Sequence, residues 1–160
     1  MARSRWILFG TCIMSMYGVG QVWLVQLSSY RLWAFVGQRE FHAYHLIWWH
    51  SIWGVVLAPA VIVFVGAVLM LRWRVSGIPA WCTWLGFGLQ MTLLFGTALW
   101  WGPLMARAEG PDGALLIERY QLLMATHWLR VAIVTAYGLL TCWMLARSTW
   151  RPAESENSAA

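Results

Sequence analysis

Four long apolar runs dominate this sequence and limit what it can fold into. They cover residues 6–27, 44–71, 78–102 and 120–146. A helix needs about 20 apolar residues to cross the hydrocarbon core of a bilayer, and each run reaches that length. We therefore predict an all-α fold, an integral membrane four-helix bundle within residues 1–150. The polar residues 151–160 are expected to form a disordered cytoplasmic tail.

The composition excludes two broad classes of function. Hydrophobic residues make up 61% of the chain and charged residues 11%, a balance that a soluble domain of this size cannot bury. The four runs leave no room for a soluble catalytic domain. The net charge of +5 comes from eleven basic residues, all arginine, which stand singly or in pairs near the ends of the runs. Nucleic-acid-binding proteins gather such charge on one face, so we expect no nucleic-acid partner.

The arginines also predict an orientation. One end of the bundle carries six of them, namely Arg3, Arg5, Arg72, Arg74, Arg147 and Arg151. The other end carries four, namely Arg31, Arg39, Arg107 and Arg119. The positive-inside rule then places both termini in the cytoplasm, and we expect a multi-pass protein of the bacterial inner membrane. The three cysteines fall near the cytoplasmic ends of their runs, so no disulfide is expected.

Polar residues inside the runs are the best candidates for function, because each is costly in a bilayer unless it has a partner. Arg130 lies near mid-membrane, and His127 is three residues before it on the same helix face. His45 and His50 enter the second run from the same side of the membrane. Four uncharged polar residues reach a similar depth from the first and third runs: Gln21, Gln26, Gln90 and Thr97. The pattern predicts one polar pocket in the outer half of the bundle.

Two kinds of chemistry fit these residues. His45 or His127 is a candidate general base, with Arg130 as the group that stabilises an anion. Alternatively, His45, His50 and His127 are candidate ligands of haem b, with Arg130 beside a propionate. No carboxylate accompanies the histidines inside the runs, which argues against a di-iron site, and we predict no other metal. The expected cofactor is therefore haem b or none.

Each candidate also has a structural interpretation. His42 is expected at the membrane interface, and His50 fits the headgroup belt beside its neighbouring tryptophans. Arg130 would tie helices together, and the glutamines would form hydrogen bonds between helices.

Short motifs resemble a known group of proteins. The second run begins with Phe41, Tyr44 and His45, and the fourth contains His127 followed by Trp128, Leu129 and Arg130. With Gly-Pro-Leu-Met at 102–105, these segments are similar to small bacterial four-helix membrane proteins that resemble the anthrone-oxygenase-like family. The chain departs from the family pattern at His127, where the family has asparagine, and at Met105, where it has histidine.

The resemblance implies cofactor-independent oxygenation of a polycyclic phenolic carbon acid. Three functions thus follow as expectations. The first is a membrane oxidoreductase or oxygenase acting on a lipophilic aromatic or quinone-like substrate. The second is a haem-binding electron-transfer or redox-complex subunit. The third is a non-catalytic accessory or lipid-binding protein. The expected partners are membrane lipid, a lipophilic small molecule, and either a second copy of the chain or another membrane subunit.

Overall fold

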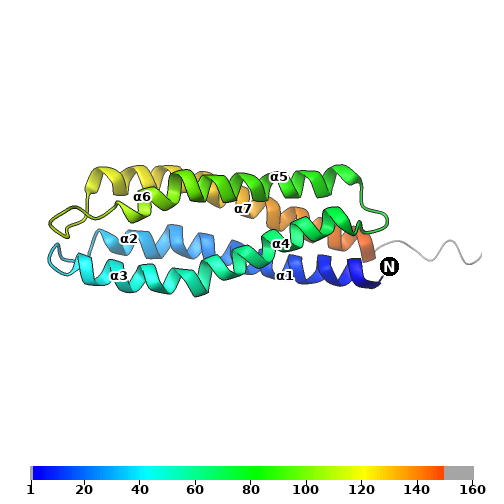
Figure 1. The fold of residues 1–160 in the computed structure, drawn as a ribbon, viewed down its shortest axis with the longest axis horizontal. Helices are drawn as coiled ribbons and strands as arrows, with labels where there is room; N and C mark the ends of the chain where they lie inside the picture. Colours follow the sequence, from blue (N-terminus) through cyan, green and yellow to red (C-terminus); the bar gives the residue numbers. More distant parts are fainter. Residues whose placement is uncertain (1, 150–160) are drawn as a thin grey trace, which may run out of the picture.

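The computed structural model describes residues 2–149 and contains four long helices joined by short loops (Figure 1). The first helix is continuous through three segments: α1 (Ala2–Leu24), the π-helical η1 (Val25–Ser29) and α2 (Tyr30–Trp33). The second consists of α3 (Phe41–Ile52), η2 (Trp53–Leu57) and α4 (Ala58–Arg72). The third consists of α5 (Ala80–Gly96), η3 (Thr97–Trp101) and α6 (Gly102–Ala106). The fourth is α7 (Ile117–Thr149).

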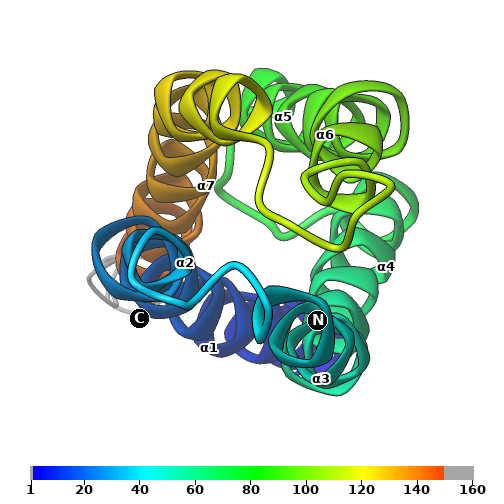
Figure 2. The same cartoon turned by 90° about the vertical axis from the view of Figure 1, so that its left-hand side faces the viewer.

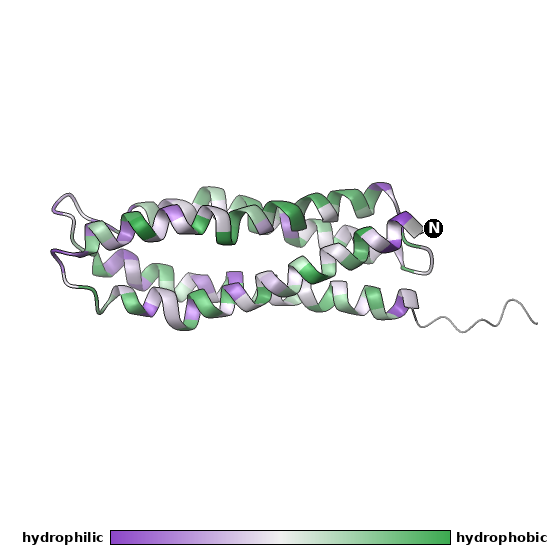
Figure 3. Ribbon diagram, turned by 90° about the horizontal axis from the view of Figure 1, so that it is seen from below, coloured by the Kyte–Doolittle hydropathy of each residue, from purple (hydrophilic) through white to green (hydrophobic). Residues whose placement is uncertain are grey.

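All four helices are long and apolar enough to cross a membrane, which confirms the all-α part of the prediction. They extend past the predicted runs into polar end residues, because a helix does not stop where its apolar stretch stops. The predicted tail at 151–160 lies outside the described residues. Figure 3 shows hydrophobic residues along the length of the helices, and many large apolar side chains are exposed. Ile47 is 71% exposed and Leu99 is 74% exposed, as expected for side chains that face lipid.

The helices alternate in direction and form a four-sided bundle (Figure 2). The first helix packs against the second and the fourth, and the third packs against the same two. Close approach to α1 depends on two glycines. A Cβ atom at Gly66 of α4 would collide with Thr11, and one at Gly138 of α7 would collide with Val19. Small residues at helix contacts are the usual means of close packing in membranes.

Three of the four helices contain a π-helical turn, and proline accounts for two of these turns. Pro59 has no N–H to offer the carbonyl of Val55, four residues earlier. The Val55 oxygen instead accepts hydrogen bonds from Gln21 Nε2 at 2.5 Å and Tyr17 Oη at 3.3 Å, both on α1. In the third helix, η3 ends two residues before Pro103. Such turns are frequent at functional sites.

Candidate functional site

A central cavity of about 350 Å³ lies at the level of the three π-helical turns and is lined by all four long helices. Most of its wall is apolar, from side chains such as Val22, Val63, Leu93 and Val134. Five of the residues predicted for a site also line it: Gln21, Gln90, Thr97, His127 and Arg130. An apolar cavity with a few convergent polar groups is the usual form of a small-molecule site.

Arg130 is the most unusual of these residues. Its side chain is only 9% exposed, yet it makes no hydrogen bond or ion pair with any residue of the described range 2–149. Its guanidinium carbon lies 5.8 Å from the centre of the Trp101 ring, a cation–π contact. A buried cation without an acid is costly. The arrangement leaves the guanidinium ready to pair with an anionic group in the cavity.

His127 lies one turn before Arg130 and has a defined tautomer. Its Nδ1 is 2.8 Å from Gln26 Oε1. The amide nitrogen of Gln26 donates to the Met124 carbonyl at 3.4 Å, so the amide oxygen faces His127 and accepts from Nδ1–H. In the neutral imidazole, Nε2 therefore carries the free lone pair. The cavity thus holds a proton acceptor and a cation side by side.

Two further polar groups face the same cavity from the third helix. Gln90 is 7% exposed and forms no hydrogen bond within the described part of the chain. The Thr97 hydroxyl, two turns further along, also has no partner there. Burying an amide without a partner costs about 1–3 kcal/mol, so both groups are suited to a ligand that supplies its own oxygen atoms.

The exposed residues of the cavity lining all belong to the second and third helices. They include Trp53, Val61 and Leu94, which are 57%, 60% and 47% exposed. The lining residues of α1 and α7 are all buried or half-buried. The opening therefore lies between the second and third helices and is framed by apolar side chains.

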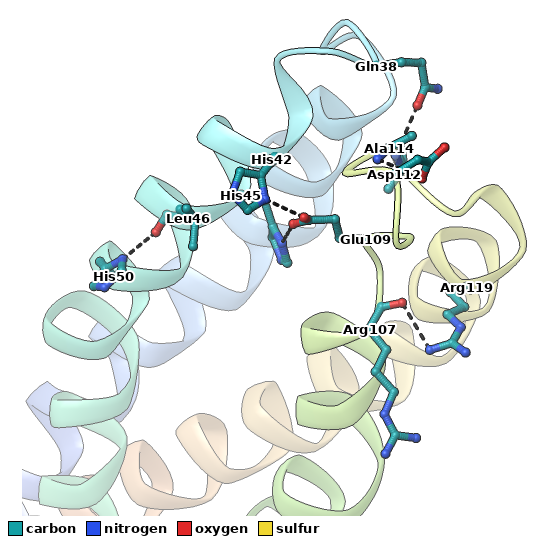
Figure 4. A network of polar contacts seen from close by, with 11 residues as sticks. Gln38, His42, His45, Leu46, His50, Arg107, Glu109, Asp112, Ala114 and Arg119 are labelled. Carbon is teal, nitrogen blue, oxygen red and sulfur yellow. Dashed lines mark hydrogen bonds and ion pairs between the residues drawn. The ribbon is translucent and has the colours of Figure 1, made fainter.

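The remaining predicted histidines lie elsewhere. His45 is buried at the end of the bundle where the loops 34–40 and 107–116 lie. Its Nδ1 is 3.0 Å from a carboxylate oxygen of Glu109. His50 is exposed and its Nδ1 contacts the Leu46 carbonyl at 2.7 Å. Figure 4 shows His45 directed at Glu109 and His50 turned away from it.

Two aromatic rings separate His45 from His127. The Tyr30 ring lies 4.9 Å from His127 and 5.2 Å from Trp33, and Trp33 lies 5.3 Å from His45. Two imidazoles that share one haem iron must face each other across it. This arrangement gives no support to ligation by that pair. Within residues 2–149, no three His, Cys, Asp or Glu side chains form a group able to hold a metal ion.

The sequence pattern does not point to Glu109 or Tyr30, and Gln26, which it places in the pocket, contacts His127 without lining the cavity. Glu109 accepts from His42 at 2.5 Å as well as from His45, and so joins the two loops at one end of the bundle. Tyr30 lines the cavity and donates to Met105 Sδ at 2.9 Å. An acid in one loop and two histidines after the adjacent loop were a usable signal for the first contact. Nothing in the spacing identifies Gln26 as the partner of His127.

The Glu109 cluster predicts a pH-dependent stability. Burial raises the pKa of Glu109, but the hydrogen bonds and charges of His42 and His45 outweigh it and lower that pKa below its ordinary value. A carboxyl with a lowered pKa stabilises the fold above its unfolded pKa, about 4.3, and this contribution disappears as the pH falls through the folded value. Glu109→Gln should therefore lower the free energy of unfolding in detergent near pH 7 by on the order of 1–2 kcal/mol. The measurement is the thermal midpoint, which should fall.

As the pH falls below about 4.3, the difference in stability between Glu109→Gln and the parent protein should shrink, because the carboxylate becomes protonated first in the unfolded and then in the folded protein. Glu40→Gln is the matched control, because Glu40 is exposed and makes no side-chain cap contact. A destabilisation by Glu109→Gln that is equal at pH 3 and pH 7 would contradict the role of the charged carboxylate.

No family model, curated protein or solved structure matches this chain. The cavity is therefore the feature of the molecule that indicates a function. Its distinguishing features are one unpaired guanidinium, one oriented imidazole, and an apolar opening between two helices.

Proposed function

We propose that this chain is a multi-pass membrane protein that binds a lipophilic weak acid in its central cavity and removes a proton from it. The observation that carries the proposal is the placement of Arg130 and the free Nε2 of His127 in one apolar cavity. The substrate class is an aromatic phenol, a quinol or an enolisable carbon acid. The membrane is the bacterial inner membrane, with both termini in the cytoplasm, as the arginine distribution favours.

Each polar residue of the cavity has its own role in the proposed reaction. His127 Nε2 accepts the proton of the substrate O–H or C–H. The electron pair of that bond remains on the substrate as phenolate or enolate, and its charged oxygen pairs with the Arg130 guanidinium. Gln90 and Thr97 can bond a second oxygen of the substrate from the adjacent wall, which the third helix forms. The apolar wall excludes water, which strengthens the ion pair.

The opening between the second and third helices supports a substrate dissolved in the bilayer. Its rim consists of exposed apolar side chains, including Val61 and Leu94. At mid-helix these face hydrocarbon when the protein spans a membrane. A lipophilic molecule then reaches Arg130 without crossing the polar ends of the bundle.

Oxygenation is the reaction that follows from enolate formation when dioxygen is the oxidant. The carbon that loses the proton, a methylene in the substrate, takes one oxygen atom and becomes a carbonyl, and the second oxygen atom leaves as water with both hydrogens of that methylene. The protein then supplies deprotonation and positioning rather than a redox group. The resemblance of the sequence to anthrone-oxygenase-like proteins agrees with this chemistry.

A coloured lipophilic nitrophenol tests the binding step without knowledge of the natural substrate. We expect the phenol to bind to the purified protein in detergent and to ionise more readily than in empty micelles. A cation within about 4–6 Å raises the ionisation constant by about 10- to 1,000-fold. The measurement is the phenolate absorbance across a pH series. Binding without enhanced ionisation would contradict the proposed chemistry and favour a non-catalytic lipid-binding role.

A further inference from the structure

A second hollow lies at the opposite end of the bundle from the Glu109 cluster. Its volume is about 340 Å³, and it is lined by Arg3, Ser4, Arg72, Trp73, Arg74 and Ser76. These residues come from the start of α1, the end of α4 and the loop that follows. Three guanidinium groups therefore border a space with room for a small polar group.

The charge around this hollow is not balanced by acids. The described acids are Glu40, Glu109, Asp112 and Glu118, all in or beside the two loops at the other end. Accordingly, none of the three arginines forms an ion pair within residues 2–149. Arg5 and Arg147 add further positive charge at the same end, and Arg147 donates to the Gly77 carbonyl at 3.2 Å.

Trp73 forms one wall of the hollow and holds Arg3 in place. The guanidinium carbon of Arg3 lies 4.2 Å from the centre of the Trp73 ring, so stacking holds this arginine over the loop. Arginine matches the geometry of phosphate oxygens and binds them in pairs of hydrogen bonds. Tryptophan and arginine together are typical of the level where lipid headgroups begin.

We propose that this hollow binds the phosphate group of an anionic phospholipid. The inference rests on the proposed membrane insertion but not on the chemistry proposed for the cavity. The hollow lies at the end of helices that are long enough to span a bilayer, where lipid phosphates are concentrated. Basic pockets between helix ends on the cytoplasmic side are a known means of recognising anionic headgroups.

Native mass spectrometry of the purified protein tests this proposal. The ligands are phosphatidylglycerol and phosphatidylcholine of equal chain length, titrated separately. We expect phosphatidylglycerol to bind at least about tenfold more tightly. The double variant Arg72→Ser/Arg74→Ser should lose this preference. The double variant Arg31→Ser/Arg39→Ser removes the same charge from the other end and should keep it.

Two further measurements test the geometry of the arginines and the source of the phosphate. Arg72→Lys/Arg74→Lys keeps the charge that directs membrane insertion, and it should bind phosphatidylglycerol several-fold more weakly than the parent. Glycerol phosphate should not displace the lipid at millimolar concentration. Equal affinity for the two lipids, equal loss in both serine variants, or displacement by glycerol phosphate would each overturn the proposal. The nitrophenol assay should be unchanged in the Arg72→Lys/Arg74→Lys variant, which separates this site from the cavity.

Discussion

Arg130→Leu should abolish the ionisation of bound phenol and, in the same protein, raise its thermal stability. Both effects have one cause. Arg130 has no acid partner among residues 2–149, so its burial is costly and its charge is available to a ligand. Leucine removes that cost, and an unfolding midpoint in detergent higher by a few degrees is expected. Loss of this cation, the one arginine among the described residues that line the cavity, should lower turnover of an anthrone-type carbon acid by about 10²–10³-fold.

The direction of the stability change separates function from structure. If Arg130 instead ties helices together, Arg130→Leu must lower the midpoint and the yield of inserted protein. Arg39→Leu is the matched control, because Arg39 is exposed in the loop that follows α2 and does not line the cavity. It should leave both the midpoint and the phenol spectrum as in the parent protein. An Arg130→Leu variant that still ionises the phenol would remove Arg130 from the proposed mechanism.

His127→Leu should slow proton abstraction while leaving anion binding largely intact. Without Nε2 the cavity loses its base, and general-base catalysis contributes about 10²–10⁴-fold. The Arg130 guanidinium remains and can still pair with a phenolate formed in solution. The measurement is hydrogen–deuterium exchange at the acidic carbon of anthrone, beside equilibrium binding of the nitrophenolate at a pH where it is already ionised.

His50→Leu is the control for this substitution, since His50 is exposed and lies outside the cavity. It should not change the exchange rate. Equal loss of exchange and of phenolate binding in His127→Leu would mean that the substitution damages the cavity as a whole. Unchanged exchange would show that His127 is not the base.

The sequence predicts the four helices because their signal is local. A run of about 20 apolar residues has few alternatives to a helix in a bilayer, and the structure has four helices that meet this criterion. The common level of Gln21, Gln90, Thr97, His127 and Arg130 follows from depth, since antiparallel helices bring residues of equal depth to one level, and their polarity favours the interior over lipid. Their common position on the cavity wall is therefore accessible from spacing and the rise per residue.

Rotation about the helix axis is what the spacing leaves open. His45 and His127 have similar depths in the sequence, yet Tyr30 and Trp33 separate them and His45 faces Glu109. Such contacts depend on how each helix turns about its axis and on the folding of two loops. Neither is encoded in hydrophobic periodicity. The contact of Gln26 with His127 has the same origin, because it joins residues 101 positions apart.

The three π-helical turns have a consequence for the shape of this cavity. A π-turn holds one residue more than an α-turn between its bonded groups, and each of η1, η2 and η3 ends in such a bond, for example from the Tyr30 N–H to the Val25 oxygen. Single-codon insertions can therefore widen a helix locally while its flanking segments keep their partners. Three wider turns at one level therefore coincide with the hollow centre of the bundle, while the flanking α-helical segments remain closely packed.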